Sequence, residues 1–113
     1  MPRRSKFGAV KTVVDGITFD SKAEARYYGQ LRLLERAGEI SNLRLQVPFV
    51  LAPAVVLGGR KRPALRYLAD FTYETTTGVT VVADVKGAIT DSYRIKRHLM
   101  KAVHGIEVQE VRL

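Results

Sequence analysis

The chain has 113 residues, of which 46% are apolar, and its 19 Lys and Arg against 11 Asp and Glu produce a net charge of +8. This length suits a single domain, 1–113, and the positive charge favours a polyanionic partner such as nucleic acid. The absence of cysteine excludes disulfides, thiolate zinc sites and cysteine nucleophiles. No apolar run approaches the roughly 20 residues of a membrane span and no secretory signal is recognisable, so we expect a cytoplasmic protein without a membrane partner.

The N-terminal part of the chain predicts a basic arm followed by a short β-hairpin. Residues 1–8 contain three cations that could follow a phosphate backbone, although a loose terminus is the simpler interpretation. These cations are Arg3, Arg4 and Lys6. In residues 10–19, Asp15-Gly16 lies between β-branched residues, which is typical of a two-residue type I′ turn. We expect two short strands at the edge of a sheet.

Residues 21–37 predict an amphipathic helix. Asp20 or Ser21 can cap its N-terminus, and Gly38 follows its last residue. An apolar stripe at helical spacing consists of Tyr27, Tyr28, Leu31 and Leu34. Glu24 lies on or beside this stripe. Because it follows Ser21 by three residues, as in a capping box, the local sequence favours a capping role as much as a functional one.

Residues 43–50 alternate in polarity and predict a strand, which Pro48 restricts to a sheet edge or a bulge. Gln46 within it is a secondary candidate for a functional site, and an ordinary surface glutamine is the alternative. Residues 54–57 continue in an extended conformation. Residues 58–66 predict a flexible loop whose cations could contact phosphates or simply face solvent. The loop cations are Arg60, Lys61, Arg62 and Arg66.

Residues 66–87 predict the hairpin around which the rest of the chain is organised. Its two flanks alternate with a period of two and are rich in aromatic and β-branched residues, which is the strand pattern. The apolar positions are Tyr67, Ala69, Phe71 and Tyr73 on the first flank, and Val79, Val81, Ala83 and Val85 on the second. We expect each set to share one side of its strand, with a tight connection at residues 75–78.

Two acids and a lysine are predicted on the other side of this hairpin. If the turn is centred near Thr77, Asp70 lies opposite Asp84, and Lys86 follows two residues later on the same face. Two carboxylates placed across a strand pair repel each other unless a cation lies between them. The pattern therefore indicates a divalent-metal site with a lysine beside it, and a solvated polar face is the alternative.

A second helix is predicted from Asp91 or Ser92 to about Val103, followed by Gly105. Its apolar positions are Tyr93, Ile95, Leu99, Met100 and Val103. A basic face consists of Arg94, Arg97, His98 and Lys101. This face suits a nucleic-acid backbone, or it is simply the solvent side of the helix. Lys96 lies nearer the apolar edge, where it can point towards the acids and contact nucleic acid. Residues 106–112 alternate again and predict a last strand.

The order helix, strands, central hairpin, helix and strand, with the acids and the lysine at these places, resembles the PD-(D/E)XK nuclease superfamily. More narrowly, residues 14–46, 67–73 and 81–87 look like a small family of phage and prophage proteins that are generally classed as endonucleases of this superfamily. The resemblance extends from about Lys11 to Val111. It implies an α/β (α+β) fold with a restriction-endonuclease-like αβββαβ core, in which two helices flank a mixed central sheet.

The resemblance also implies roles for four residues. Asp70 and Asp84 match the two acids of the motif, Lys86 matches its lysine, and Glu24 matches an acid that many members carry on the first helix. The three acids would bind Mg²⁺ or Mn²⁺, which prefer oxygen ligands, and Lys86 would orient the attacking water and offset developing charge. Two departures are that Ala69 replaces the motif's proline and that the second acid is Asp.

We therefore expect a metal-dependent endonuclease that hydrolyses DNA phosphodiester bonds. The resemblance further implies branched or otherwise structured DNA, as for a Holliday-junction resolvase, in phage recombination, replication or packaging. It also implies a homodimer, located in the host cytoplasm if the protein is phage-encoded. The alternative from another class is a non-catalytic nucleic-acid-binding module that retains the fold. A nuclease acting on RNA is a third alternative.

Overall fold

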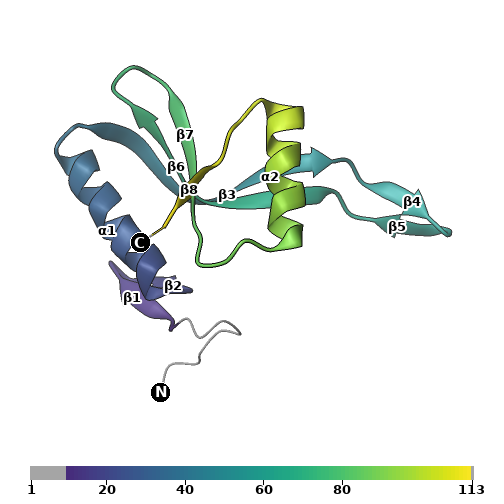
Figure 1. Ribbon diagram of the computed structural model, residues 1–113, viewed down its shortest axis with the longest axis horizontal. Coiled ribbons are helices and arrows are strands. Elements are labelled where there is room, and N and C mark those ends of the chain that lie inside the picture. Colours follow the sequence, from purple (N-terminus) through teal and green to yellow (C-terminus); the bar gives the residue numbers. More distant parts are fainter. Residues whose placement is uncertain (1–9, 113) are drawn as a thin grey trace.

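A four-stranded sheet lies between two helices in the computed structural model, which describes residues 10–112 (Figure 1). The sheet has the order β3-β6-β7-β8, with β3 (Ile40–Ala52), β6 (Leu65–Thr75), β7 (Thr80–Val85) and β8 (Gln109–Val111). β3, β6 and β7 are antiparallel neighbours, whereas β8 runs parallel to β7. The helices are α1 (Lys22–Arg36) and α2 (Asp91–His104). The expected mixed α/β class, with two helices and a mixed sheet, is confirmed.

The N-terminal hairpin consists of β1 (Thr12–Val14) and β2 (Ile17–Phe19). Its turn residues Asp15 and Gly16 have φ angles of 53° and 74°, as the expected type I′ turn requires. The prediction that these strands lie at the edge of a larger sheet is wrong, because they form a separate two-stranded sheet that packs on α1. Phe19 is the buried residue that this hairpin contributes to the core, and the partly buried Val14 and Ile17 pack against that core.

The prediction of a flexible loop at residues 58–66 is also wrong. Residues Arg60–Arg62 form β5, which pairs with β4 (Val55–Leu57), and β6 begins at Leu65. Gly58 and Gly59 have φ angles of 56° and 77°, which residues with a side chain rarely adopt, and they form the two-residue turn of this hairpin. The Gly-Gly pair after three aliphatic residues was the overlooked signal. The β4–β5 hairpin projects from the body of the molecule (Figure 1).

Helix α1 begins as expected, since the Ser21 Oγ accepts a hydrogen bond from the Glu24 amide at 3.1 Å. The prediction that Leu34 belongs to the apolar stripe of this helix is wrong, because Leu34 is 42% exposed. At 100° per residue, Leu34 lies at the flank of the face that buries Tyr28 and Leu31. The face continues instead to Glu35, whose carboxylate accepts a hydrogen bond from the Leu43 amide at 3.2 Å.

Helix α2 differs from expectation at its cap and in its stripe. Thr90 is the N-cap, one residue before the expected Asp91 or Ser92, and its Oγ1 accepts from the Tyr93 amide at 3.1 Å. Tyr93 and Met100 are its buried residues. The expected apolar positions Ile95 and Val103 are 62% and 52% exposed, because they lie outside the face of the helix that Tyr93 and Met100 occupy.

Two apolar cores lie on opposite sides of the sheet. Adjacent residues of a strand point to opposite faces, and accordingly Ala83 packs in the core beneath α1 whereas Val82 packs in the core beneath α2. The α1 core also contains Phe19, Ala25, Tyr27, Tyr28, Leu31, Ile40, Phe71 and Val111. The α2 core also contains Leu51, Tyr67, Ala69, Tyr93, Met100 and Val108.

The expectation that the apolar residues of β6 share one side is wrong. Tyr67 and Ala69 pack in the α2 core, whereas Phe71 packs in the α1 core with Tyr73 against it. The change of side occurs at Asp70. On the other flank, Val79 was expected among the apolar positions of the strand, but it precedes β7 and is 57% exposed. The central hairpin therefore contains a local irregularity at the residue that carries the first candidate acid.

Within residues 10–112, neither helix is long and apolar enough to cross a membrane.

Candidate functional site

The candidate site lies where β6 and β7 separate. Their register pairs Thr72 with Val82 and Phe71 with Ala83, so the next position places Asp70 opposite Asp84, as expected. Beyond that point β6 continues along β3, and β7 continues along β8. Such a divergence leaves backbone groups without ladder partners, which must find other hydrogen bonds.

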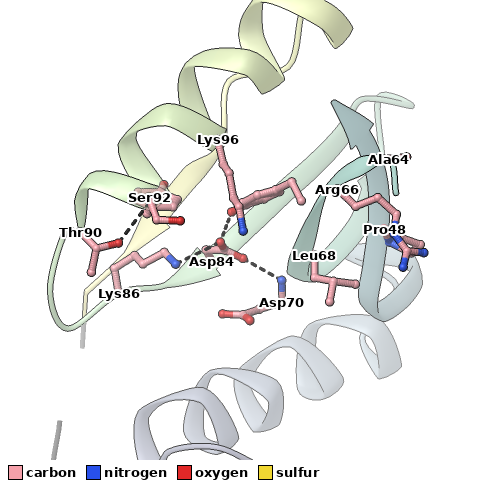
Figure 2. Close-up of a pocket in the computed structure, with 12 residues that line it drawn as sticks. Pro48, Ala64, Arg66, Leu68, Asp70, Asp84, Lys86, Thr90, Ser92 and Lys96 are labelled. Carbon is pink, nitrogen blue, oxygen red and sulfur yellow. Dashed lines mark hydrogen bonds and ion pairs between the residues drawn. The ribbon is translucent and has the colours of Figure 1, made fainter. Parts of the chain in front are cut away.

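The two carboxylates themselves supply these hydrogen bonds. Asp84 Oδ1 accepts from the Asp70 amide at 2.7 Å (Figure 2). Asp70 Oδ2 accepts from the Val85 amide at 3.1 Å. Each acid is thus held by the backbone of the opposite strand. The reciprocal bonds fix both side chains without the help of a flexible loop, so the carboxylates are preorganised.

Asp84 is almost completely buried, with 2% of its surface exposed. Its Oδ2 accepts a hydrogen bond from the Tyr67 hydroxyl and lies 3.4 Å from the Lys86 Nζ. Burial raises the pKa of Asp84, while the Asp70 amide and the Lys86 ammonium oppose that rise. Burial also raises the pKa of Asp70, against the Val85 amide and the charge of Lys86.

Lys86 is fixed by an aromatic ring as well as by Asp84. Its Nζ lies 4.1 Å from the centroid of the Tyr93 ring, within cation–π range. The Tyr93 hydroxyl donates to Glu110 Oε2 at 2.9 Å, and Arg97 forms an ion pair with the same oxygen at 2.5 Å. Lys86 is therefore held against a ring that is itself anchored. Tyr67 and Tyr93 were predicted only as apolar positions. The overlooked signal was the choice of tyrosine at core positions, since a buried hydroxyl needs a hydrogen-bond partner.

Glu24 reaches the site from α1. It is 8% exposed, and its Oε1 accepts a hydrogen bond from Gln46 Nε2 at 3.4 Å. Burial first, and then the charges of Asp70, Asp20 and Asp84, raise the pKa of Glu24 from 4.5 to about 7, while the Asp20 backbone opposes the rise. Ser21 caps the Glu24 amide, but within residues 10–112 no hydrogen bond returns from the Ser21 amide to the Glu24 carboxylate. The capping box is thus half formed.

Gln46 lies beside two of the acids. Besides its contact with Glu24, its side-chain amide lowers the pKa of Asp70. Its backbone has a φ of 52°, in the left-handed region that non-glycine residues seldom adopt. Gln46 is exposed, as the alternative of a surface glutamine expects, but its side chain also contacts Glu24.

A divalent cation at this site would take its protein ligands from the acidic side chains. Within residues 10–112, no three His, Cys, Asp or Glu side chains are gathered as one metal-binding group. Asp70 and Asp84 lie together, and Glu24 interacts with both through its charge and with Asp70 also through a side-chain hydrogen bond that lowers the pKa of Asp70. Mg²⁺ retains several waters and commonly takes only one or two carboxylates from a protein, so the two aspartates fit this ion. Three acids with raised pKa values beside one lysine also favour an added cation.

A cavity of about 590 Å³ opens beside the acids (Figure 2). Asp70, Asp84 and Lys86 line one part of it, Lys96 reaches towards Asp84 from α2, and Arg66 lies at the opposite end beside Pro48. Carboxylates beside several cations form a mixed site, which suits a metal together with a phosphate group. Glu24 and Gln46 are not among the residues that line this cavity.

The other candidate nucleic-acid contacts are not gathered at this site. Arg94 and Lys101 are exposed on α2, whereas Arg97 is engaged by Glu110, so the expected basic face of α2 is interrupted. The cations of β5 lie on the projecting hairpin and are Arg60, Lys61 and Arg62. The candidates Arg3, Arg4 and Lys6, on the arm expected at residues 1–8, lie outside the described residues.

The fold and the site together define a mixed α/β domain with an Asp–Asp–Lys cluster between two diverging antiparallel strands. The chain belongs to the family described as "Protein of unknown function (DUF1064)", whose model matches residues 4–112. No curated protein and no solved structure matches the chain.

Proposed function

We propose that the protein is a metal-dependent endonuclease that hydrolyses phosphodiester bonds in DNA. The observation that carries this proposal is the pair Asp70 and Asp84, each held by the opposite strand, with the Lys86 ammonium 3.4 Å from Asp84 at a cavity. A cluster maintained only for folding has no need of two buried carboxylates with raised pKa values.

Asp70 and Asp84 would bind Mg²⁺ or Mn²⁺, and Glu24 would assist directly or through a water molecule. When bound, the ion would polarise the scissile phosphate and lower the pKa of a water molecule. Lys86 would orient the attacking water and offset the negative charge that develops on the phosphate. Arg66 and Lys96, which line the same cavity, would hold the phosphate backbone in place.

The order of elements supports the proposal. Setting aside the hairpins β1–β2 and β4–β5, the chain runs α1, β3, β6, β7, α2, β8, which is the αβββαβ order of a restriction-endonuclease-like core. By the same resemblance we propose branched or otherwise structured DNA as the substrate, and a homodimer in which two sites address two strands.

A non-catalytic nucleic-acid-binding module is the second candidate. It is favoured by the fact that Tyr67, Lys86 and backbone amides already satisfy the two aspartates, and by the lack of a gathered three-acid group within residues 10–112. Such a module would keep its DNA affinity when Asp70 becomes Asn, and it would not cleave.

The test is cleavage of four-way junction, flap, duplex and single-stranded DNA, and of an RNA strand, with Mg²⁺ or Mn²⁺. Wild type is compared with Asp70→Asn and Lys86→Ala, and with Asp91→Asn, which changes an exposed aspartate on α2. Cleavage by wild type and by Asp91→Asn, lost in the other two variants and in EDTA, would support the nuclease. Binding of DNA without cleavage of any substrate would favour the binding module.

A further inference from the structure

The β4–β5 hairpin is the most protruding part of the chain that the structure describes (Figure 1). It pairs an aliphatic strand with a cationic one, in the register Val55 with Arg62, Val56 with Lys61 and Leu57 with Arg60. All six residues are exposed, and Val56 is 68% exposed. An isolated two-stranded hairpin is only marginally stable in water, and exposed neighbouring aliphatics are unusual without a partner. This hairpin therefore has the character of a binding element.

The charge around this hairpin is of one sign. Residues 40–69 contain no Asp or Glu, and their cations are Arg44, Arg60, Lys61, Arg62 and Arg66. Within residues 10–112, no ion pair joins an acid to any cation of β5. The potential of these side chains is thus not neutralised by the protein, which favours a polyanion as the occupant rather than a second copy of this basic chain.

The two faces of the hairpin differ. Cross-strand partners share a face, and successive residues alternate. One face therefore carries Leu57 with Arg60 and Val55 with Arg62, while the other carries Val56 with Lys61. The first face combines two guanidinium groups with two aliphatic side chains. Guanidinium groups bind phosphate oxygens, and aliphatic groups contact the thymine methyl group at the edge of a base pair.

The hairpin is also continuous with the cavity. Ala64 and Arg66, which follow β5 in the chain, line the end of the cavity away from Lys86. From Arg66 to Arg60 the nearly extended chain spans roughly 20 Å at about 3.4 Å per residue. The same length corresponds to about six base pairs of a DNA duplex, at about 3.4 Å each. Cations therefore continue from the cavity along the hairpin to its tip.

We propose that the β4–β5 hairpin is an arm that binds double-stranded DNA in the major groove, and that it reaches about six base pairs beyond the end of the cavity at Arg66. The major groove, about 12 Å wide, admits a two-stranded β-ribbon. Arg60 and Arg62 contact phosphates, and Leu57 contacts base edges. This inference rests on the proposed function in taking DNA as the ligand, and it adds that the substrate must be duplex on the side of the cut that the arm reaches.

The experiment measures binding of the full chain to a fluorescein-labelled duplex of about two helical turns, and to one of its single strands, in EDTA at several salt concentrations. The charge variant is Arg60→Ala/Lys61→Ala/Arg62→Ala, and the apolar variant is Leu57→Ser. A matched control, Lys11→Ala/Arg26→Ala/Arg36→Ala, removes three exposed cations, one directly before β1 and two on α1. Circular dichroism verifies that each variant is folded.

The charge variant is expected to lose about tenfold or more in duplex affinity at about 0.1 M salt, and its salt slope should fall by about 1.8, since Arg60 and Arg62 each contribute about 0.9 through a phosphate contact. Leu57→Ser is expected to weaken duplex binding without changing that slope. Single-strand binding should change less in both variants, and the control should lose less duplex affinity than the charge variant.

Four results would overturn the proposal. The first two are an equal loss of duplex affinity in the charge variant and the control, and an equal loss of affinity for duplex and single strand in the charge variant. The third is that Leu57→Ser changes a dimer to a monomer and leaves DNA binding intact. The fourth is that the arm is needed for binding to anionic vesicles but not for binding to DNA. The two proposals fail separately. Arm-dependent duplex binding without cleavage by wild type would refute only the nuclease, and cleavage with no effect of the arm variants on binding would refute only the arm.

Discussion

Replacing Glu24 by Gln should stabilise the metal-free protein at neutral and alkaline pH. Burial and the nearby aspartates raise the pKa of Glu24 from 4.5 to about 7, so between these values the folded state binds more protons than the unfolded state. Stability therefore falls as the pH rises through this window. Since each pKa unit corresponds to about 1.4 kcal/mol, ionised Glu24 lowers the free energy of unfolding by about 3 kcal/mol above the window.

The assay is urea unfolding in EDTA, followed by circular dichroism, at several pH values from about 4 to about 8. Glu24→Gln should match wild type at the acid end and exceed it by about 3 kcal/mol at the alkaline end. The exposed variant Glu107→Gln serves as the control and should keep the pH dependence of wild type. A difference between Glu24→Gln and wild type that does not change with pH would refute the reasoning.

Three further predictions concern the packing of the site. Tyr67→Phe removes a donor to the buried Asp84 carboxylate and should lower the free energy of unfolding by about 1.5–3 kcal/mol, measured by urea unfolding; no loss would mean that Asp84 does not depend on this hydroxyl. Phe71→Ala empties a fully buried position between the aromatic rings of α1 and β2 and should cost about 3–5 kcal/mol, and calorimetry showing less than about 1 kcal/mol would contradict that packing. Tyr93→Phe keeps the ring beside Lys86 but loses a hydrogen bond, so stability should fall by about 1 kcal/mol while DNA cleavage falls less than in Lys86→Ala; an equal fall in cleavage would contradict it.

The sequence predicted best what depends on local periodicity and turn chemistry. The helix over residues 21–37, its Ser21 cap and the Asp15-Gly16 turn were all predictable, because each depends on a few neighbouring residues. The register of the central hairpin followed from its turn and placed Asp70 opposite Asp84.

What the sequence did not predict depends on tertiary structure. A period of two implied that Tyr67 and Phe71 share a side, but β6 separates from β7 at Asp70 while it stays paired with β3, and the two residues pack in different cores. Similarly, the hydroxyl of Tyr67 reaches Asp84 only because β6 and β7 diverge. These contacts join residues far apart in the chain, and no local pattern signals them. The β4–β5 hairpin was missed for a different reason, since its Gly58-Gly59 signal was present but a cation-rich segment suggested a loop.

The most direct test of the central claim is nicking of a supercoiled plasmid with Mg²⁺, comparing wild type, Asp84→Asn and the exposed control Asp91→Asn. The Asp84 carboxylate contacts the Tyr67 hydroxyl, the Asp70 amide and the Lys86 ammonium. Replacement by Asn preserves the shape of this side chain while removing its charge. We predict nicking by wild type and by Asp91→Asn, abolished by EDTA and reduced by about a hundredfold to a thousandfold in Asp84→Asn, as for loss of a group that stabilises the transition state. Equal nicking by wild type and Asp84→Asn, or no nicking by wild type with Mg²⁺ or Mn²⁺, would contradict the account.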